Sequence, residues 1–549
     1  MIHERKRVFG LIAALALLSL PGCDDDDLEL VVKPDASADA SADASSVVDA
    51  GSSIDASTLL DAALDATSDA STDAAAPTQL VPARVATLVN ESAADYAHNR
   101  WGLIEGATLA TYATQWNVVD SAAADALANG RPRNLAADAR LVVLQLNAAN
   151  RAAGELYVPS TPTSRVYTYE LDSFRFNEVR DTGLISNSVR YQASGVTTDA
   201  WLARYGIDLR RDFVVFAAGE NTAANGGFFQ DLARAVYWLR YWGASIDRLA
   251  ILNGTLKQNY AGALASTRTP DGALGNDGFS VKDLRVDHTS LTLPLESFLA
   301  VVDANLQASG VIEGYAKQFI IDARPTAQFN RTTNTAAFFT THPGQFITTA
   351  FNSAGAPSED ATGQAKTYVP VEGHVRGAVS FPWASLLVDA GGGNYRYRPK
   401  AELAQIFASA GYAPTAKSDT VIVSQCRTNF EVQVNGFAAL HILGYPTVHY
   451  DGSLVEYFSL VSGHPDASLN LQPSDAAYKF RTDTPARTQF YTASANPQAP
   501  STTEDATGVA AYNVASGSTP TDRKIAQAQV RRDATTTRAA LDADRAYKR

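Results

Sequence analysis

One order of elements occurs twice in the chain, and it constrains the fold more than any other feature. Each copy has a short apolar run, a segment with apolar residues at helical spacing, and a second apolar run. Short apolar runs are typical of strands buried on both faces of a parallel sheet. The segments are Phe213 to Phe216, Asp231 to Trp242 and Leu249 to Leu252 in the first copy, and Val421 to Val423, Val432 to Leu443 and Val448 to Tyr450 in the second.

Other segments extend the same alternation. Leu141 to Leu146 and Phe319 to Ile321 are further predicted strands, and Glu402 to Ala410 is a further predicted helix. Strands that alternate with helices indicate an α/β fold. We therefore expect two similar domains, each with a mainly parallel sheet flanked by helices, produced by duplication of one unit.

The N-terminus predicts export and a lipid anchor. Arg5, Lys6 and Arg7 precede an apolar run from Val8 to Leu20, which is too short to span a membrane and is typical of a signal peptide. The run ends in Leu-Pro-Gly-Cys, which resembles the bacterial lipobox, with Cys23 as the acylated residue. An ordinary signal peptide followed by a chance cysteine is the alternative. The expected location is the bacterial cell envelope, on the periplasmic or outer-membrane face.

An acidic tract follows Cys23. Asp, Ala and Ser dominate it, and Lys33 is its only basic residue before Arg84. Such a composition cannot bury enough apolar surface to offset its conformational entropy, so we expect a disordered tether. The formal net charge of the chain is -13, which argues against a nucleic-acid partner.

These features predict six segments, and the sequence leaves the oligomeric state open. They are a signal peptide at 1–22, a disordered tether at 23–80, a first α/β domain at 84–262, a connector at 263–312, a second α/β domain at 313–473 and a polar C-terminal extension, partly helical, at 474–549.

Cys426 is the residue most suggestive of chemistry. It is the only cysteine besides Cys23, so within one chain it has no disulfide partner once Cys23 is acylated. It lies between a predicted strand and a predicted helix, where ligands bind in parallel α/β folds. Backbone N–H groups at a helix start favour anions, so we expect a thiol pKa below the usual value of about 8.5. A small buried side chain with no chemistry is the alternative.

An ordered set of short motifs surrounds this cysteine. Together these motifs resemble the catalytic domain of the rhodanese family over residues 319–458, and residues 101–260 resemble the non-catalytic domain of its tandem members. In the first half, Ala217 to Glu220 stand where a nucleophile is expected. The motifs are Asp322 to Pro325, Gly373 to Val379, Cys426 with its loop, Leu443 to Pro446 and Tyr450 to Ser453.

The resemblance implies a sulfurtransferase that needs no cofactor. Cys426 takes the outer sulfur of a small anionic donor, thiosulfate first and 3-mercaptopyruvate second. It holds that sulfur as a persulfide until a thiophilic acceptor, such as cyanide or a thiol, removes it. Arg427 is the expected cation for the donor. The implied substrate-binding residues are Arg427, Thr428, Asn429, Phe430 and Glu431.

Several other functions fit the sequence less well. A phosphatase with a related loop needs an arginine six places after the cysteine, where this chain has Val432. His441 and His449 lie in apolar segments, which argues against a thiol protease. The eight histidines show no metal-ligand spacing, so no metal is expected. The unusual residues 428–431 motivate one rival, a degenerate member of the family that acts as a binding or scaffold module.

Overall fold

The apolar runs of the sequence form the inner strands of two parallel sheets. The computed structural model describes residues 80, 82–123, 126–147, 156–171, 177–183, 188–220, 224–275, 278–329, 374, 375, 377–460 and 535–549. The predicted signal peptide, Cys23, nearly all of the predicted tether and most of the C-terminal extension lie outside these residues. Among the residues described, no helix has the length and apolar character needed to cross a membrane.

The first sheet has the strand order β1-β7-β6-β2-β3, with every neighbouring pair parallel. Its inner strands are buried along their whole length, as expected for strands covered on both faces. The strands are β1 (Gly102–Ile104), β2 (Leu141–Leu146), β3 (Val166–Leu171), β6 (Phe213–Ala218) and β7 (Leu249–Thr255).

The second sheet repeats this topology. Its order is β8-β14-β13-β9-β10, again with every pair parallel, and β13 occupies the centre. Numbered along the chain, the strands of both sheets follow the order first, fifth, fourth, second, third. The prediction of a duplicated α/β unit with mainly parallel sheets is confirmed. The strands are β8 (Thr292–Leu293), β9 (Lys317–Asp322), β10 (Val379–Ser380), β13 (Thr420–Gln425) and β14 (Thr447–Tyr450).

One part of the expected organisation differs. The segment 263–312 was expected to be a connector, but it contains β8 and the helix α5 (Leu295–Gln307). β8 pairs with β14 at the edge of the second sheet. A strand of two residues has no periodicity, so the sequence pattern could not distinguish it from a loop.

Helices and two small antiparallel pairs complete the described part of the chain. The pairs are β4 (Asn177–Arg180) with β5 (Ser188–Gln192), and β11 (Leu387–Asp389) with β12 (Tyr395–Tyr397). The remaining helices are α1 (Gly106–Gln115), α2 (Gly195–Tyr205), α3 (Phe228–Tyr241), α4 (Leu256–Asn259), α6 (Thr326–Phe329), α8 (Lys400–Ser409), α9 (Glu431–Phe437), α10 (Ser453–Leu460) and α13 (Ala539–Lys548).

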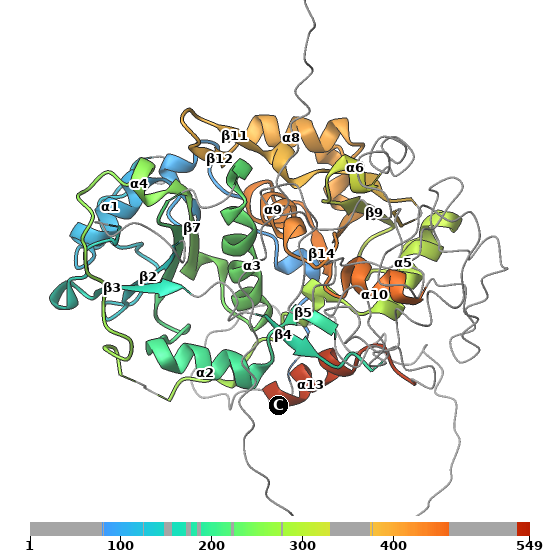
Figure 1. Cartoon of the computed structure of the whole chain (residues 1–549), viewed down its shortest axis with the longest axis horizontal. Helices are drawn as coiled ribbons and strands as arrows, with labels where there is room; N and C mark the ends of the chain where they lie inside the picture. The colour runs from blue at the N-terminus through green and yellow to red at the C-terminus, as the bar shows by residue number, and fades with distance from the viewer. Residues whose placement is uncertain are drawn as a thin grey trace, which may run out of the picture. The chain divides into compact units, whose positions relative to one another are not determined.

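Helices α3 and α9 join the two halves. Each follows the central part of its own sheet, and the two pack against each other (Figure 1). A single cluster of buried apolar side chains includes Leu232 and Val236 of α3 together with Val434 and Phe437 of α9. α9 continues into a π-helical turn, η10 (Ala438–Ile442). The long helix predicted for residues 432–443 is thus confirmed, with a change of geometry in its last turn.

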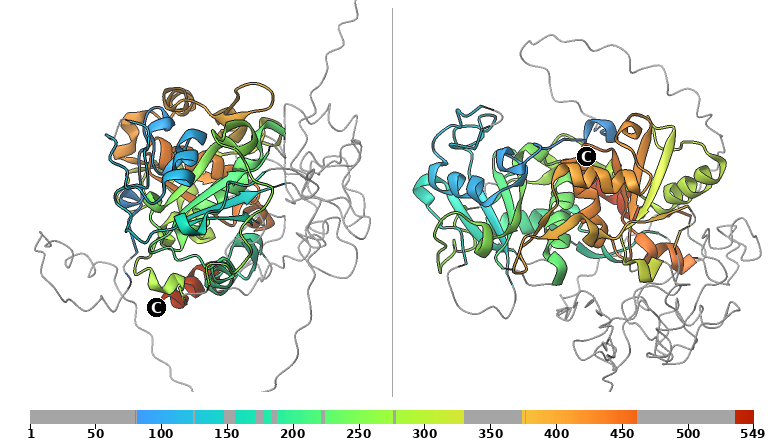
Figure 2. Two further views of the ribbon diagram at one scale, coloured as in Figure 1. Left: turned by 90° about the vertical axis from the view of Figure 1, so that its left-hand side faces the viewer. Right: turned by 90° about the horizontal axis from the view of Figure 1, so that it is seen from above.

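The C-terminal helix α13 packs against the first half of the chain and against the segment that precedes β8. It contacts α2 and the short turn η6 (Val281–Asp283), and it is red in both views of Figure 2. Ala540, Leu541 and Asp544 on this helix are buried. The helical character expected for the end of the chain is confirmed, and the burial shows that this helix is an integral part of the fold.

Candidate functional site

Cys426 lies directly after β13, at the carboxyl end of the central strand of the second sheet. Its side chain is fully buried. Residues 426–430, here called the Cys426 loop, connect β13 to α9. The start of α10, which follows β14, is attached to this loop, because the N–H of Leu454 donates to the carbonyl oxygen of Cys426 at 3.1 Å. The predicted order of strand, cysteine and helix is therefore confirmed.

A backbone N–H group donates a hydrogen bond to the sulfur. The N–H of Asn429 donates to Sγ at 3.1 Å, and the backbone N–H groups of Thr428 and Val432 act to lower the pKa of the thiol. Asn429 has φ of 63°, in the left-handed region, which asparagine adopts more readily than most residues. Backbone N–H groups placed in this way beside a sulfur stabilise negative charge on it.

Burial nevertheless raises the pKa of the Cys426 thiol to about 12. The negative charge of Glu431 is the second cause, while the N–H donors act in the opposite direction. The expectation of a thiol more acidic than free cysteine is wrong for Cys426 when its side chain is buried by the loop. The sequence identified the N–H donors but could not show how completely the loop excludes water from the sulfur.

Asp451, which follows β14, holds the Cys426 loop from the neighbouring strand. Its Oδ1 accepts a hydrogen bond from Nδ2 of Asn429. On the other side of the same amide, Oδ1 of Asn429 accepts from Nε2 of Gln433 at 2.9 Å. Both ends of the Asn429 side chain are thereby fixed, which holds the backbone conformation that directs its N–H at the sulfur.

A cation from the first half of the chain faces Asp451. Nη1 of Arg234, on α3, lies 2.7 Å from Oδ1 of Asp451, and both side chains are 0% exposed. The guanidinium carbon also lies 5.4 Å from the centre of the Phe430 ring. The Cys426 loop therefore depends on a residue that is about 190 positions earlier in the sequence.

The expected substrate-binding residues lie together in this loop and at the start of α9. Arg427 is partly exposed, whereas Thr428, Asn429, Phe430 and Glu431 are buried. At the equivalent end of the first sheet, β6 is followed by Gly219 and Glu220, so that position has no thiol. The structure brings the five expected residues into one place, and their contact with a substrate stays a prediction.

Two residues from the motifs around Cys426 make structural contacts. Arg324 forms a buried ion pair with Asp322 at 2.7 Å. His374 stacks on Phe329 with 3.8 Å between ring centres and contacts the carbonyl oxygen of the same residue. Neither residue contributes an acid or base to the Cys426 loop through these contacts.

The histidines near the site are also core residues. His441 and His449 are buried, and desolvation lowers the pKa of His449 to about 3. Within the described ranges, no group of three His, Cys, Asp or Glu side chains is arranged to hold a metal.

Sequence reasoning missed Arg234 and the role of Asp451. A weak signal existed for each residue. Arg234 interrupts the apolar pattern of a helix between Ala233 and Ala235, and Asp451 follows a buried strand at the same sheet edge as Cys426. The signals could not be combined, because only the packing of α3 against α9 brings the two side chains together.

No protein-family model and no curated protein matches the sequence. Solved structures of EanB are similar over part of the chain. A variant in complex with ergothioneine has 15% identity and a TM-score of 0.38, covering 58% of this chain and 62% of EanB. The anaerobic ergothioneine biosynthesis enzyme from Chlorobium limicola, with its natural substrate trimethyl histidine, has 14% identity, a TM-score of 0.38 and the same coverage.

A third EanB structure holds a cysteine persulfide in a tetrahedral intermediate state with ergothioneine. It has 14% identity and a TM-score of 0.38, covering 60% of this chain and 64% of EanB. The similar region thus spans less than two thirds of each of these structures. At these values the likeness does not assign an activity to this chain.

The expected membership of the tandem rhodanese family is wrong. No family model supports it, and the similar solved structures include those of EanB. The motifs that suggested it are short segments around strand ends and turns. Such segments report local geometry that different α/β proteins share, so their order along the chain did not define a family.

Proposed function

We propose that this protein is an enzyme that transfers sulfur, with Cys426 as the residue that carries it. The observation that supports this proposal is the hydrogen bond from the backbone N–H of Asn429 to Sγ, at the carboxyl end of the central strand. Ligands of open parallel sheets bind at this edge. A backbone N–H donor suits a sulfur atom that becomes negatively charged during a reaction.

The proposed reaction has two steps. The Cys426 thiolate attacks the outer sulfur of thiosulfate, a new S–S bond forms, and sulfite leaves with the electron pair of the broken bond. A thiophilic acceptor such as cyanide then attacks the outer sulfur of the persulfide, which forms thiocyanate and regenerates the thiolate. Neither step needs an oxidant, a reductant or a cofactor.

Two charged residues are proposed to set the response to an anionic donor. Arg427 is the partly exposed residue of the Cys426 loop, so it is placed to meet a donor from solution. Glu431 raises the pKa of the thiol and repels an anion. Because Cys426 is fully buried, the donor must displace the side chains that cover it before the thiolate can react.

The proposal is tested by mass spectrometry of the protein with Cys23→Ser, in which Cys426 is the only cysteine. Treatment with thiosulfate should add one sulfur atom to the peptide that contains Cys426, and cyanide should remove it as thiocyanate. Cys426→Ser should acquire no sulfur, because a hydroxyl cannot form a persulfide. Arg427→Gln should slow the addition about tenfold or more, since a charge-assisted contact contributes about 1.5 to 3 kcal/mol.

A second candidate function is a catalytically inactive binding or scaffold module. The complete burial of Cys426 and its raised pKa favour this alternative. If folded, reduced protein acquires no sulfur from thiosulfate or from 3-mercaptopyruvate, the enzyme proposal fails and this alternative stands.

We further propose that Cys23 anchors the protein to the bacterial cell envelope through lipid. The support is the sequence before this residue, a basic segment and a short apolar run that ends in Leu-Pro-Gly-Cys. Cys23→Ser should abolish fatty-acid labelling and release the protein from the membrane fraction. Unchanged labelling and membrane association in this variant would contradict the proposal.

A further inference from the structure

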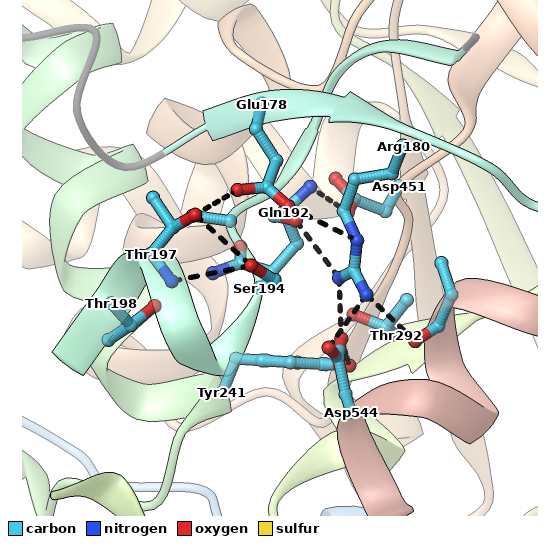
Figure 3. A network of polar contacts seen from close by, with 12 residues as sticks. Glu178, Arg180, Gln192, Ser194, Thr197, Thr198, Tyr241, Thr292, Asp451 and Asp544 are labelled. Carbon is cyan, nitrogen blue, oxygen red and sulfur yellow. Dashed lines mark hydrogen bonds and ion pairs between the residues drawn. The ribbon is translucent and has the colours of Figure 1, made fainter. Parts of the chain in front are cut away.

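A buried polar network extends from the C-terminal helix into the body of the protein (Figure 3). Asp544 of α13 accepts two hydrogen bonds from Arg180 of β4, both at 2.8 Å. Tyr241 of α3 donates to the same carboxylate at 2.7 Å. Asp544 is 1% exposed and Arg180 is 8% exposed, so this is an ion pair within the fold.

The network continues toward the Cys426 loop through one backbone segment. Nη1 of Arg180 donates to the carbonyl oxygen of Gln192 at 3.2 Å. The N–H of Gln192 donates in turn to Oδ2 of Asp451 at 2.9 Å. The other oxygen of Asp451 accepts from Arg234 and from the side chain of Asn429. Each step is a direct contact, so the path from α13 to the loop is continuous.

Gln192 links Arg180 to Asp451, because its backbone carbonyl oxygen and its backbone N–H each form a hydrogen bond. Its carbonyl oxygen is held by Arg180 and its N–H by Asp451, at the end of β5. A shift of Arg180 therefore moves the donor that orients Asp451. Asp451 in turn fixes the Asn429 amide, and the Asn429 N–H is one of the donors to the sulfur.

We propose that Asp451 is a positioning residue for Cys426 and that the C-terminal helix α13, through Asp544 and Arg180, holds Asp451 in place. While α13 is docked, the Cys426 loop covers the sulfur and the N–H of Asn429 stays directed at it. The last residues of the chain thus belong to the same functional unit as Cys426. The relevance of these contacts to sulfur transfer rests on the proposed function. Their effect on the conformation of the Cys426 loop does not.

The test measures the rate at which iodoacetamide alkylates Cys426 in full-length protein with Cys23→Ser. Asp544→Asn keeps the size of the side chain but removes its charge, so it should loosen Arg180 and the contacts beyond it. We expect alkylation to become about tenfold faster or more, as the loop opens locally. This readout needs no sulfur donor, so it fails or succeeds independently of the sulfur-transfer reaction.

Urea separates local opening from a general loss of stability. A rate that comes from global unfolding rises steeply with urea, whereas a rate that comes from local opening does not. Tyr547→Phe is the matched control, since it removes a hydrogen bond from α13 to Asp199 and leaves Asp544 unchanged. We expect Tyr547→Phe to leave the rate in the absence of urea at the wild-type value.

Two results would overturn the proposal. One is an Asp544→Asn rate that equals the wild-type rate or exceeds it only through global unfolding. The other is an equal acceleration by Tyr547→Phe. If Asp544→Asn does not fold, Tyr241→Phe decides the question, because it removes one hydrogen bond to Asp544 and should accelerate alkylation in the same direction by a smaller factor.

Discussion

Iodoacetamide should alkylate Cys426 in the folded protein about a thousandfold more slowly at pH 8 than in the unfolded chain. The reason is the thiolate fraction. A thiol whose pKa is about 12 is ionised to about one part in ten thousand at pH 8, whereas a thiol with the ordinary pKa of about 8.5 is ionised to about a quarter. The measurement uses the Cys23→Ser protein in buffer and in concentrated urea, followed by mass spectrometry.

The pH dependence checks the cause of this protection. Since folding raises the pKa of the thiol, the rate in the folded protein should keep rising about tenfold per pH unit from pH 8 to pH 10, while the rate in urea levels off above about pH 9. Glu431→Gln removes the second cause of the raised pKa and should make folded protein react faster. A folded rate within tenfold of the unfolded rate would show that the closed loop is not the state in solution.

Arg234→Met should lower the free energy of unfolding by about 3 to 5 kcal/mol. The substitution keeps an apolar side chain of similar length but removes the cation that faces the fully buried carboxylate of Asp451. Leaving a charged group in the protein interior without its partner is more costly than losing the contact alone. Urea or thermal unfolding of the wild-type protein and of Arg234→Met gives the difference in the free energy of unfolding directly.

Two further variants test this explanation. Asp451→Asn combined with Arg234→Met removes both charges, so it should recover a large part of the loss. Arg84→Ala breaks an exposed ion pair, since Arg84 is 65% and Glu313 is 72% exposed, and it should change stability by less than about 1 kcal/mol. Similar losses for Arg84→Ala and Arg234→Met would refute the explanation from burial.

Much of the fold was predictable because the inner strands are apolar and regularly spaced. The runs at 141–146, 213–216, 249–252 and 421–423 became β2, β6, β7 and β13. Their burial on both faces leaves a pattern that a sequence displays directly. The short edge strands β8 and β10 have two residues each, and so little pattern that only pairing within the sheet reveals them.

The candidate site was predictable in part. The position of Cys426 between a strand and a helix follows from local patterns, as does the grouping of residues 427–431 beside it. The state of the thiol did not follow. A pKa depends on how much water reaches the sulfur and on the balance between N–H donors and the charge of Glu431, and both quantities depend on packing.

By itself, the sequence determined the α/β class, the duplicated unit and the identity of the cysteine most suited to chemistry, because each depends on residues close together in the chain. Only the tertiary structure decided what holds that cysteine. Arg234, Gln192 and Asp544 come from three distant segments, and the folded chain connects all three to Asp451 through buried contacts. Contacts between distant segments leave no periodicity in a single sequence, so the positioning of Cys426 became visible only in the folded protein.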